Sequence, residues 1–152
     1  MIIDGKKIAG EILEGLQAAR APLKPVLKLG VVMGVDDPAI QSFVRVKERV
    51  AERLQVVVVR ETLGTDATTA DALRALERLA RGADGIIVQL PLPMSVDTEA
   101  VLAAIPPARD VDAIGLKALP LVQPPVVEAI SEIFVRAGVA ARGARASCGG
   151  SL

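Results

Sequence analysis

The sequence of 152 residues contains no histidine, tryptophan or tyrosine, and it has only two phenylalanines and one cysteine. Without histidine, the chain cannot supply a Ser-His-Asp or Cys-His nucleophile, a histidine metal ligand or a histidine proton shuttle. An acid or base on this chain must therefore be Asp, Glu or Lys. The single thiol, Cys148, cannot form a disulfide within one chain, which fits a reducing compartment. We therefore expect a cytoplasmic protein.

The sequence also lacks an excess of charge of either sign and lacks long apolar runs. The 18 basic and 18 acidic side chains give a net charge of zero, and two aromatic rings leave little on which bases stack. The apolar runs are far shorter than the ~20 residues that span a bilayer. We therefore expect neither a nucleic-acid partner nor a membrane. The mean hydropathy of +0.45 is high, which predicts apolar surface that another domain or subunit covers.

The apolar periodicity predicts helices that alternate with strands. Prolines and glycines separate the segments, and Thr68 or Thr69 is a plausible N-cap of the third helix. The run of four valines is typical of a parallel strand buried on both faces. The predicted fold class is α/β, an open and mostly parallel sheet flanked by helices in three layers. The predicted helices are 7–20, 39–54, 68–80, 98–105 and 126–137, and the predicted strands are 26–33, 56–59 and 84–90.

Ligands of such sheets bind beyond the carboxyl ends of the strands. Lys47 follows the first strand and lies one helical turn after Phe43, so the two side chains share a helix face. Such a lysine can act as an acid or base while the ring packs on a planar ligand. The alternative is a solvated lysine above a core phenylalanine.

Two further segments end at the same edge of the predicted sheet. Gln89 interrupts an apolar strand, so its amide binds a ligand, a neighbouring side chain or the loop backbone. Asp110 and Asp112 point the same way if the segment is extended, and one of them can accept N–H groups of a heterocycle. The alternative is that they cap the loop. No further ligands complete a metal site, and no glycine-rich phosphate loop follows a strand, so we expect no metal and no bound cofactor.

Four segments together resemble the N-terminal catalytic domain of the bifunctional methylenetetrahydrofolate dehydrogenase/methenyltetrahydrofolate cyclohydrolase family. The third, GlyIleIleValGlnLeuProLeuPro, is highly specific. The resemblance predicts a folate-site domain over 1–140 and a truncated tail over 141–152, where the NADP-binding Rossmann domain of the family would begin. The matching segments are 2–9, 36–47, 84–93 and 106–115.

The resemblance implies a role for each candidate residue. Lys47 would be the acid/base that opens the methenyl bridge, with Gln89 tuning that lysine as the second catalytic residue. Asp112 would anchor the pterin ring, and Phe43, Leu90 and Pro91 would complete the substrate-binding set. The chain departs from the family pattern in having Phe43 for tyrosine, Ile40 for serine, Ala113 for glycine, and ProLeuValGlnProPro at 120–125 for a ProCysThrPro segment.

The resemblance implies a role in one-carbon metabolism with a folate-type small molecule as ligand. The full-length family uses NADP, so we expect no hydride transfer by this chain alone. Three hypotheses remain open: a minimal cyclohydrolase that uses Lys47, a non-catalytic folate-binding or partner-binding module, and a truncated product without a role of its own. The expected protein partners are a second copy, giving a homodimer, or a full-length relative.

Overall fold

The computed structural model describes residues 3–23, 25–34, 38–115, 117 and 123–139. The predicted tail over 141–152, Cys148 and residues 120–122 of the 120–125 segment lie outside these residues. Helices and strands alternate along the chain as the periodicity predicts. In order they are α1 (Gly5–Arg20), β1 (Leu27–Met33), α2 (Pro38–Arg53), β2 (Val56–Thr62), α3 (Thr69–Ala80), β3 (Gly85–Gln89), α4 (Thr98–Ala103), the 3-10 turn η1 (Pro107–Arg109) and α5 (Pro125–Arg136).

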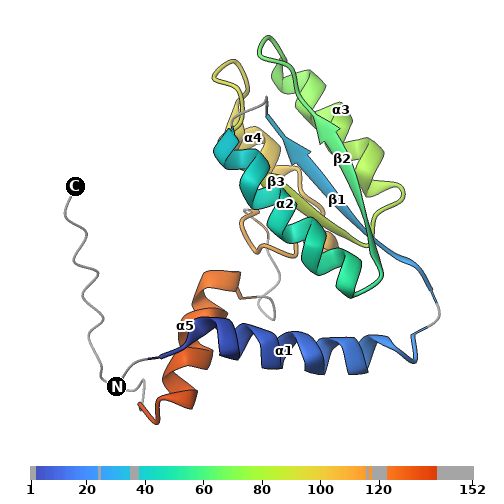
Figure 1. Ribbon diagram of the computed structural model, residues 1–152. Coiled ribbons are helices and arrows are strands. Elements are labelled where there is room, and N and C mark those ends of the chain that lie inside the picture. The colour runs from blue at the N-terminus through green and yellow to red at the C-terminus, as the bar shows by residue number, and fades with distance from the viewer. Residues whose placement is uncertain (1–2, 24, 35–37, 116, 118–122, 140–152) are drawn as a thin grey trace.

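The strands form a parallel sheet in the order β2-β1-β3, with helices on both faces (Figure 1). On one face, Ile40 and Val44 of α2 pack against Val31, Met33 and Ile87. On the other face, α3 and α4 enclose a larger apolar cluster. A parallel bridge between Ile86 and Asp110 continues the sheet beyond β3. The three-layer α/β prediction is confirmed.

The prediction that the valine run is buried on both faces is wrong. Val57 is 47% exposed and Val59 is 38% exposed, because β2 is an edge strand. Ion pairs hold the end of this strand from both sides. Arg60 pairs with Glu48 of α2, and Glu61 pairs with Arg78 of α3 at 2.7 Å. The four valines thus reflect β-propensity at an edge rather than full burial.

Helices α1 and α5 lie together, apart from the α/β body (Figure 1). Leu13 is the one buried residue of α1, and α5 has none. Arg136 of α5 pairs with Glu11, while Gln17 of α1 exchanges hydrogen bonds with Arg53 of α2 at 3.2 and 3.3 Å. Large apolar side chains on these two helices are exposed, in agreement with the high mean hydropathy; they include Ile12, Leu16, Val126, Val127, Ile130 and Val135.

Polar side chains set the starts of the helices. Asp4 accepts from the backbone N–H of Lys6 and Lys7, so α1 begins two residues before the predicted helix. Thr68 caps α3 through a reciprocal capping box with Asp71. No helix in the described ranges is long and apolar enough to cross a membrane.

The capping box makes the free energy of unfolding depend on pH in the acid range. Hydrogen bonds from the Thr68 side chain and backbone, and then from Arg74, lower the pKa of Asp71 to about 2. A folded-state pKa below the unfolded value of about 4 means that this stabilisation is complete above pH 4 and is lost as the pH falls towards 2. Asp71→Asn is therefore expected to flatten the stability profile in this window in urea titrations. Asp66→Asn, in the preceding loop, should leave the profile unchanged, and an equal effect there would contradict the assignment to the cap.

Candidate active site

Three predicted site residues meet at the carboxyl end of the sheet. The Lys47 ammonium donates a hydrogen bond to Oε1 of Gln89 at 3.1 Å, and its Nζ lies 3.7 Å from Oδ2 of Asp112. The side chains of Lys47 and Asp112 are 33% and 23% exposed. Lys47 comes from α2, Gln89 ends β3, and Asp112 lies in the loop after η1. Packing of α2 over the sheet therefore joins residues that are far apart in the sequence.

The Gln89 amide is held in one orientation. Its Nε2 donates to the carbonyl of Leu90 at 3.2 Å, which leaves Oε1 as the atom that faces Lys47. The loop backbone and a neighbouring side chain thus both hydrogen-bond to this amide. Two of the partners that the sequence left open for Gln89 are therefore present at the same time. An ammonium has three N–H groups, and Gln89 takes one of them. The Lys47 nitrogen keeps hydrogen-bonding capacity for a ligand.

Phe43 lies one turn before Lys47 on α2 and is 63% exposed. The alternative of a core phenylalanine is therefore wrong, and the alternative of a fully solvated lysine does not describe the partly buried Lys47. An exposed ring beside a partly buried lysine gives the site an apolar wall. Such a wall can pack against a planar ligand.

The loop after β3 carries the other two predicted substrate-binding residues. Leu90 is 40% exposed, Pro91 is exposed, and the peptide bond between them is cis. A side chain at Gly34 would place Cβ 3.1 Å from Cδ of Pro93 and 3.3 Å from the carbonyl oxygen of Pro91. Glycine at position 34 therefore lets the end of β1 approach this loop, a contact that sequence reasoning missed.

Asp110 and Asp112 do not share a direction, which corrects the prediction for an extended segment. Asp110 is 3% exposed and accepts from the backbone N–H of Gly115 at 2.8 Å and of Ile114 at 3.4 Å. The chain bends around this carboxylate, with Ala113 at a positive φ of 51°. Asp110 thus shapes the loop, which is the role that the capping alternative predicted. Asp112 instead faces Lys47.

Ala113 adopts a left-handed backbone conformation, which favours glycine. The left-handed conformation costs an L-residue about 1–2 kcal/mol, and the greater freedom of glycine in the unfolded chain offsets part of this. Ala113→Gly is therefore expected to stabilise the protein, raising the midpoint of thermal unfolding by about 2–4 °C. The same substitution at Ala70, in the helical geometry of α3, should lower the midpoint. Destabilisation by Ala113→Gly would contradict this reading of the loop.

The described residues do not group into a metal site, and two helix N-termini already have a carboxylate. No group of three or more Asp, Glu, His or Cys side chains within the described ranges is placed to hold a metal. The N-termini of α3 and α4 are already capped by the carboxylates of Asp71 and Asp97, which disfavour a phosphate at those positions.

Comparisons with known proteins agree with this architecture. A bifunctional protein FolD of Acidiphilium cryptum is 38% identical over 95% of this chain and 55% of its own length. One from Methanospirillum hungatei is 46% identical over 74% of this chain and 41% of its own length. The chain thus spans about half the length of the curated relatives it matches.

Solved structures match at the level of the fold and of the sequence. A methylenetetrahydrofolate dehydrogenase of the silkworm Bombyx mori has a TM-score of 0.84 with 27% identity, covering 91% of this chain and 52% of that one. The dehydrogenase-cyclohydrolase (FolD) of Trypanosoma brucei, solved with NADP cofactor and inhibitor, has a TM-score of 0.83 with 26% identity and the same coverage. The family model for the catalytic domain of tetrahydrofolate dehydrogenase/cyclohydrolase matches residues 3–112. The chain belongs to this family of catalytic domains.

Proposed function

We propose that this domain binds a methenyl-bridged tetrahydrofolate and hydrolyses the bridge, with Lys47 as the acid/base. The observation that carries the proposal is the hydrogen bond between Lys47 and Gln89 beside Asp112. Family membership supplies the substrate class. The activity rests on groups that this half-length chain itself contains.

Hydrolysis of the bridge needs a base that takes a proton from the attacking water and an acid that delivers a proton to the leaving nitrogen. Water adds to the bridge carbon and loses a proton, and one of the two carbon–nitrogen bonds then breaks as its nitrogen gains a proton. The Lys47 nitrogen accepts the first proton in its amine form and returns a proton from its ammonium form. Because both transfers occur around one carbon, a single group at the end of a positioned side chain serves both.

The neighbouring residues position Lys47 and the substrate. The fixed amide of Gln89 directs the Lys47 nitrogen, so Gln89 acts as a positioning residue. The carboxylate of Asp112 accepts N–H groups of the pterin edge and faces the positive charge of the methenyl bridge. The Phe43 ring packs on the planar part of the ligand.

A second candidate function is folate binding without turnover. Phe43 favours it, because a phenyl ring keeps the packing surface but has no hydroxyl to hydrogen-bond beside Lys47. The two candidates share the binding site and differ only in proton transfer.

One experiment separates them. The decay of methenyltetrahydrofolate absorbance is followed with and without the purified 152-residue chain, and binding is measured by calorimetry with a non-hydrolysable folate. Acceleration above spontaneous hydrolysis supports the cyclohydrolase. Saturable binding without acceleration supports the binding module. Absence of both, from protein with the expected circular dichroism, would overturn both candidates.

A further inference from the structure

We propose that Gly85 and Arg109 are positioning residues for Asp112. The inference rests on the proposed function, because it concerns the carboxylate that would receive the pterin edge. Asp112 lies in the loop after η1, residues 110–115, which we call the Asp112 loop. Its Oδ2 lies 3.7 Å from Nζ of Lys47, so a movement of the loop changes this distance. Two contacts hold the N-terminal side of the Asp112 loop in place.

The first contact is between the Val111 side chain and Gly85 of β3. A Cβ at position 85 would lie 2.7 Å from Cγ1 and 3.5 Å from Cγ2 of Val111. Carbon atoms pack at about 3.5–4.0 Å, so a side chain at position 85 displaces Val111. Gly85 pairs with Leu29 in a regular parallel register, so the close approach of Val111 accounts for the glycine. Because a β-branched side chain has few rotamers, the backbone next to Asp112 must move as well.

The second contact joins Arg109 to the end of α3. Its Nη1 donates to the carbonyl of Ala80 and, at 2.5 Å, to the carbonyl of Ala83. Ala80 is the last residue of α3, so its carbonyl oxygen has no donor within the helix. A guanidinium at this end also interacts favourably with the helix dipole. Arg109 therefore holds the start of the Asp112 loop against α3.

These contacts separate the place of the Asp112 loop from its internal shape. Asp110 fixes the shape through the backbone N–H of Gly115, whereas Gly85 and Arg109 fix where the loop lies. Lys47 belongs to α2, which packs on the opposite face of the sheet from α3. Displacement of the whole loop should therefore weaken ligand binding and leave proton transfer at Lys47 intact. The expected signature is a higher dissociation constant with an unchanged rate at saturation.

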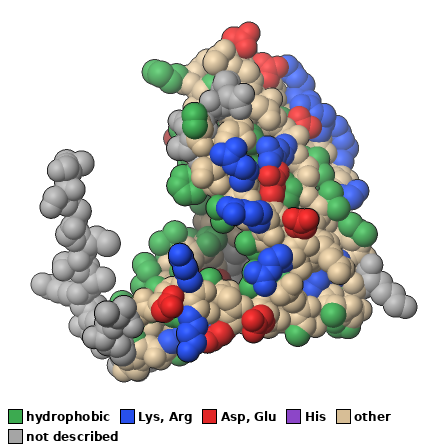
Figure 2. Space-filling view, viewed as in Figure 1, with side chains coloured by type: hydrophobic (Ala, Val, Ile, Leu, Met, Phe, Trp, Pro, Cys, Tyr) green, Lys and Arg blue, Asp and Glu red, His purple; other side chains and the backbone are tan. Residues whose placement is uncertain are grey.

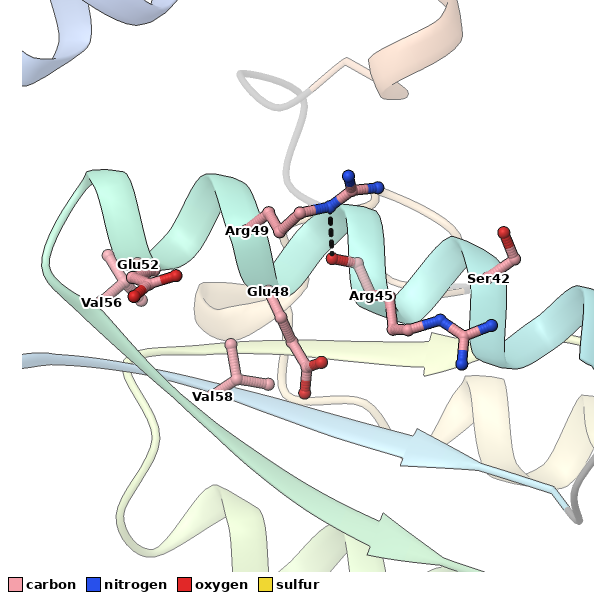
Figure 3. A pocket seen from close by; sticks show the side chains of 7 residues that line it. All are labelled: Ser42, Arg45, Glu48, Arg49, Glu52, Val56 and Val58. Atoms are coloured by element: carbon pink, nitrogen blue, oxygen red, sulfur yellow. Dashed lines mark hydrogen bonds between the residues drawn. The ribbon is translucent and has the colours of Figure 1, made fainter.

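The groove between α2 and β2 provides a matched control position. It has a volume of about 720 Å³, and Arg45 and Val58 are among its lining residues. Figure 3 shows that Arg45 extends from α2 towards the strands. Arg45 is exposed, and Figure 2 shows basic and acidic side chains intermixed over α2. Arg45→Ala therefore removes a guanidinium from the helix that carries Lys47, on a different side of that helix.

Calorimetry with a non-hydrolysable folate tests the role of the glycine. Gly85→Ala is expected to raise the dissociation constant about tenfold, because small displacements of a group that contacts the ligand have large effects. Adding Val111→Ala removes both methyl groups that the new Cβ meets. The double variant should therefore return to within about threefold of the unmodified chain. Gly82→Ala is the control, because a Cβ there meets nothing within 4 Å, and it should leave the dissociation constant unchanged.

The same measurement tests the arginine. Arg109→Ala is expected to raise the dissociation constant about fivefold. Arg109→Lys keeps a donor and should lie between Arg109→Ala and the unmodified chain, and Arg45→Ala should have no effect. For the hydrolysis reaction, KM should follow the dissociation constant while kcat stays within about twofold. Circular dichroism of each variant shows that weaker binding is not a loss of fold.

Crystal structures of the variants give a measurement that does not depend on folate. The distance from Nζ of Lys47 to Oδ2 of Asp112 should lengthen in Gly85→Ala and Arg109→Ala, and it should return in the double variant. An unchanged distance in the folded single variants would overturn the proposal, and so would unchanged affinity in a chain that binds folate. A displaced Asp112 in a chain that binds no folate would instead contradict the proposed function and support the positioning role. Should Gly85→Ala not fold, Arg109→Ala decides by the same outcomes.

Discussion

Replacing Lys47 with methionine is expected to lower the rate of methenyltetrahydrofolate hydrolysis by at least about 100-fold, the usual contribution of a positioned acid or base. Methionine keeps an unbranched apolar stem and loses the group that donates to Gln89 and exchanges protons. Stability should change little, because the Lys47 side chain is one-third exposed and its Nζ is 3.7 Å from Asp112. The measurement is absorbance decay, corrected for spontaneous hydrolysis.

The matched control is Lys28→Met, near the start of β1 at the opposite end of the sheet. It makes the same chemical change far from Gln89 and should leave the rate unchanged. Lys47→Arg separates charge from proton transfer, because a guanidinium keeps the charge but does not release its proton near neutral pH. Full activity in Lys47→Met or Lys47→Arg would remove Lys47 from the mechanism. Retention of folate binding by an inactive Lys47→Met would leave the binding site in place.

Asp110→Ala is expected to lower the free energy of unfolding by about 2–4 kcal/mol, because it leaves two backbone N–H groups without their buried carboxylate acceptor. This is a large part of the roughly 5–15 kcal/mol that separates folded from unfolded domains. The loop that carries Asp112 should lose its shape as well. We therefore expect the KM for the folate to rise more than kcat falls. Urea unfolding and steady-state kinetics measure the two effects.

Asp66→Ala provides the comparison for this prediction. Asp66 is an exposed aspartate in the loop after β2, and its removal should cost little. Asp110→Asn keeps the shape of the side chain and one acceptor oxygen, so it should lie between the unmodified protein and Asp110→Ala. Equal stability of Asp110→Ala and Asp66→Ala would show that the buried carboxylate does not hold the loop.

The sequence predicted the helices and strands well because each has a strong local signal. The amphipathic period of α2 and the Thr68 cap of α3 depend on neighbours within one or two turns. The burial of β2 was predicted wrongly because burial depends on strand order. Four consecutive valines look the same at the centre of a sheet and at its edge.

For the candidate site too, the sequence predicted some features and missed others. The rule for strand ends indicated that Lys47, Gln89 and Asp112 lie near one another, but no spacing gives the 3.1 Å contact or the direction of the Gln89 amide. Spacing alone did not separate the roles of Asp110 and Asp112, although the family resemblance singled out Asp112. The bend that separates their roles depends on a left-handed residue, Ala113, and the one sign of it in the sequence is the glycine that the family pattern has at this position.

The slight attachment of α1 and α5 has a consequence for how the molecule opens. These helices bury one residue between them, while the residues around Val31 and Ile86 are fully enclosed. Local unfolding of α1 and α5 therefore exposes little new apolar surface and requires much less free energy than global unfolding. Backbone amides of these helices should exchange with deuterium long before those of β1. The α/β body then persists as a cooperative unit while α1 and α5 open and close.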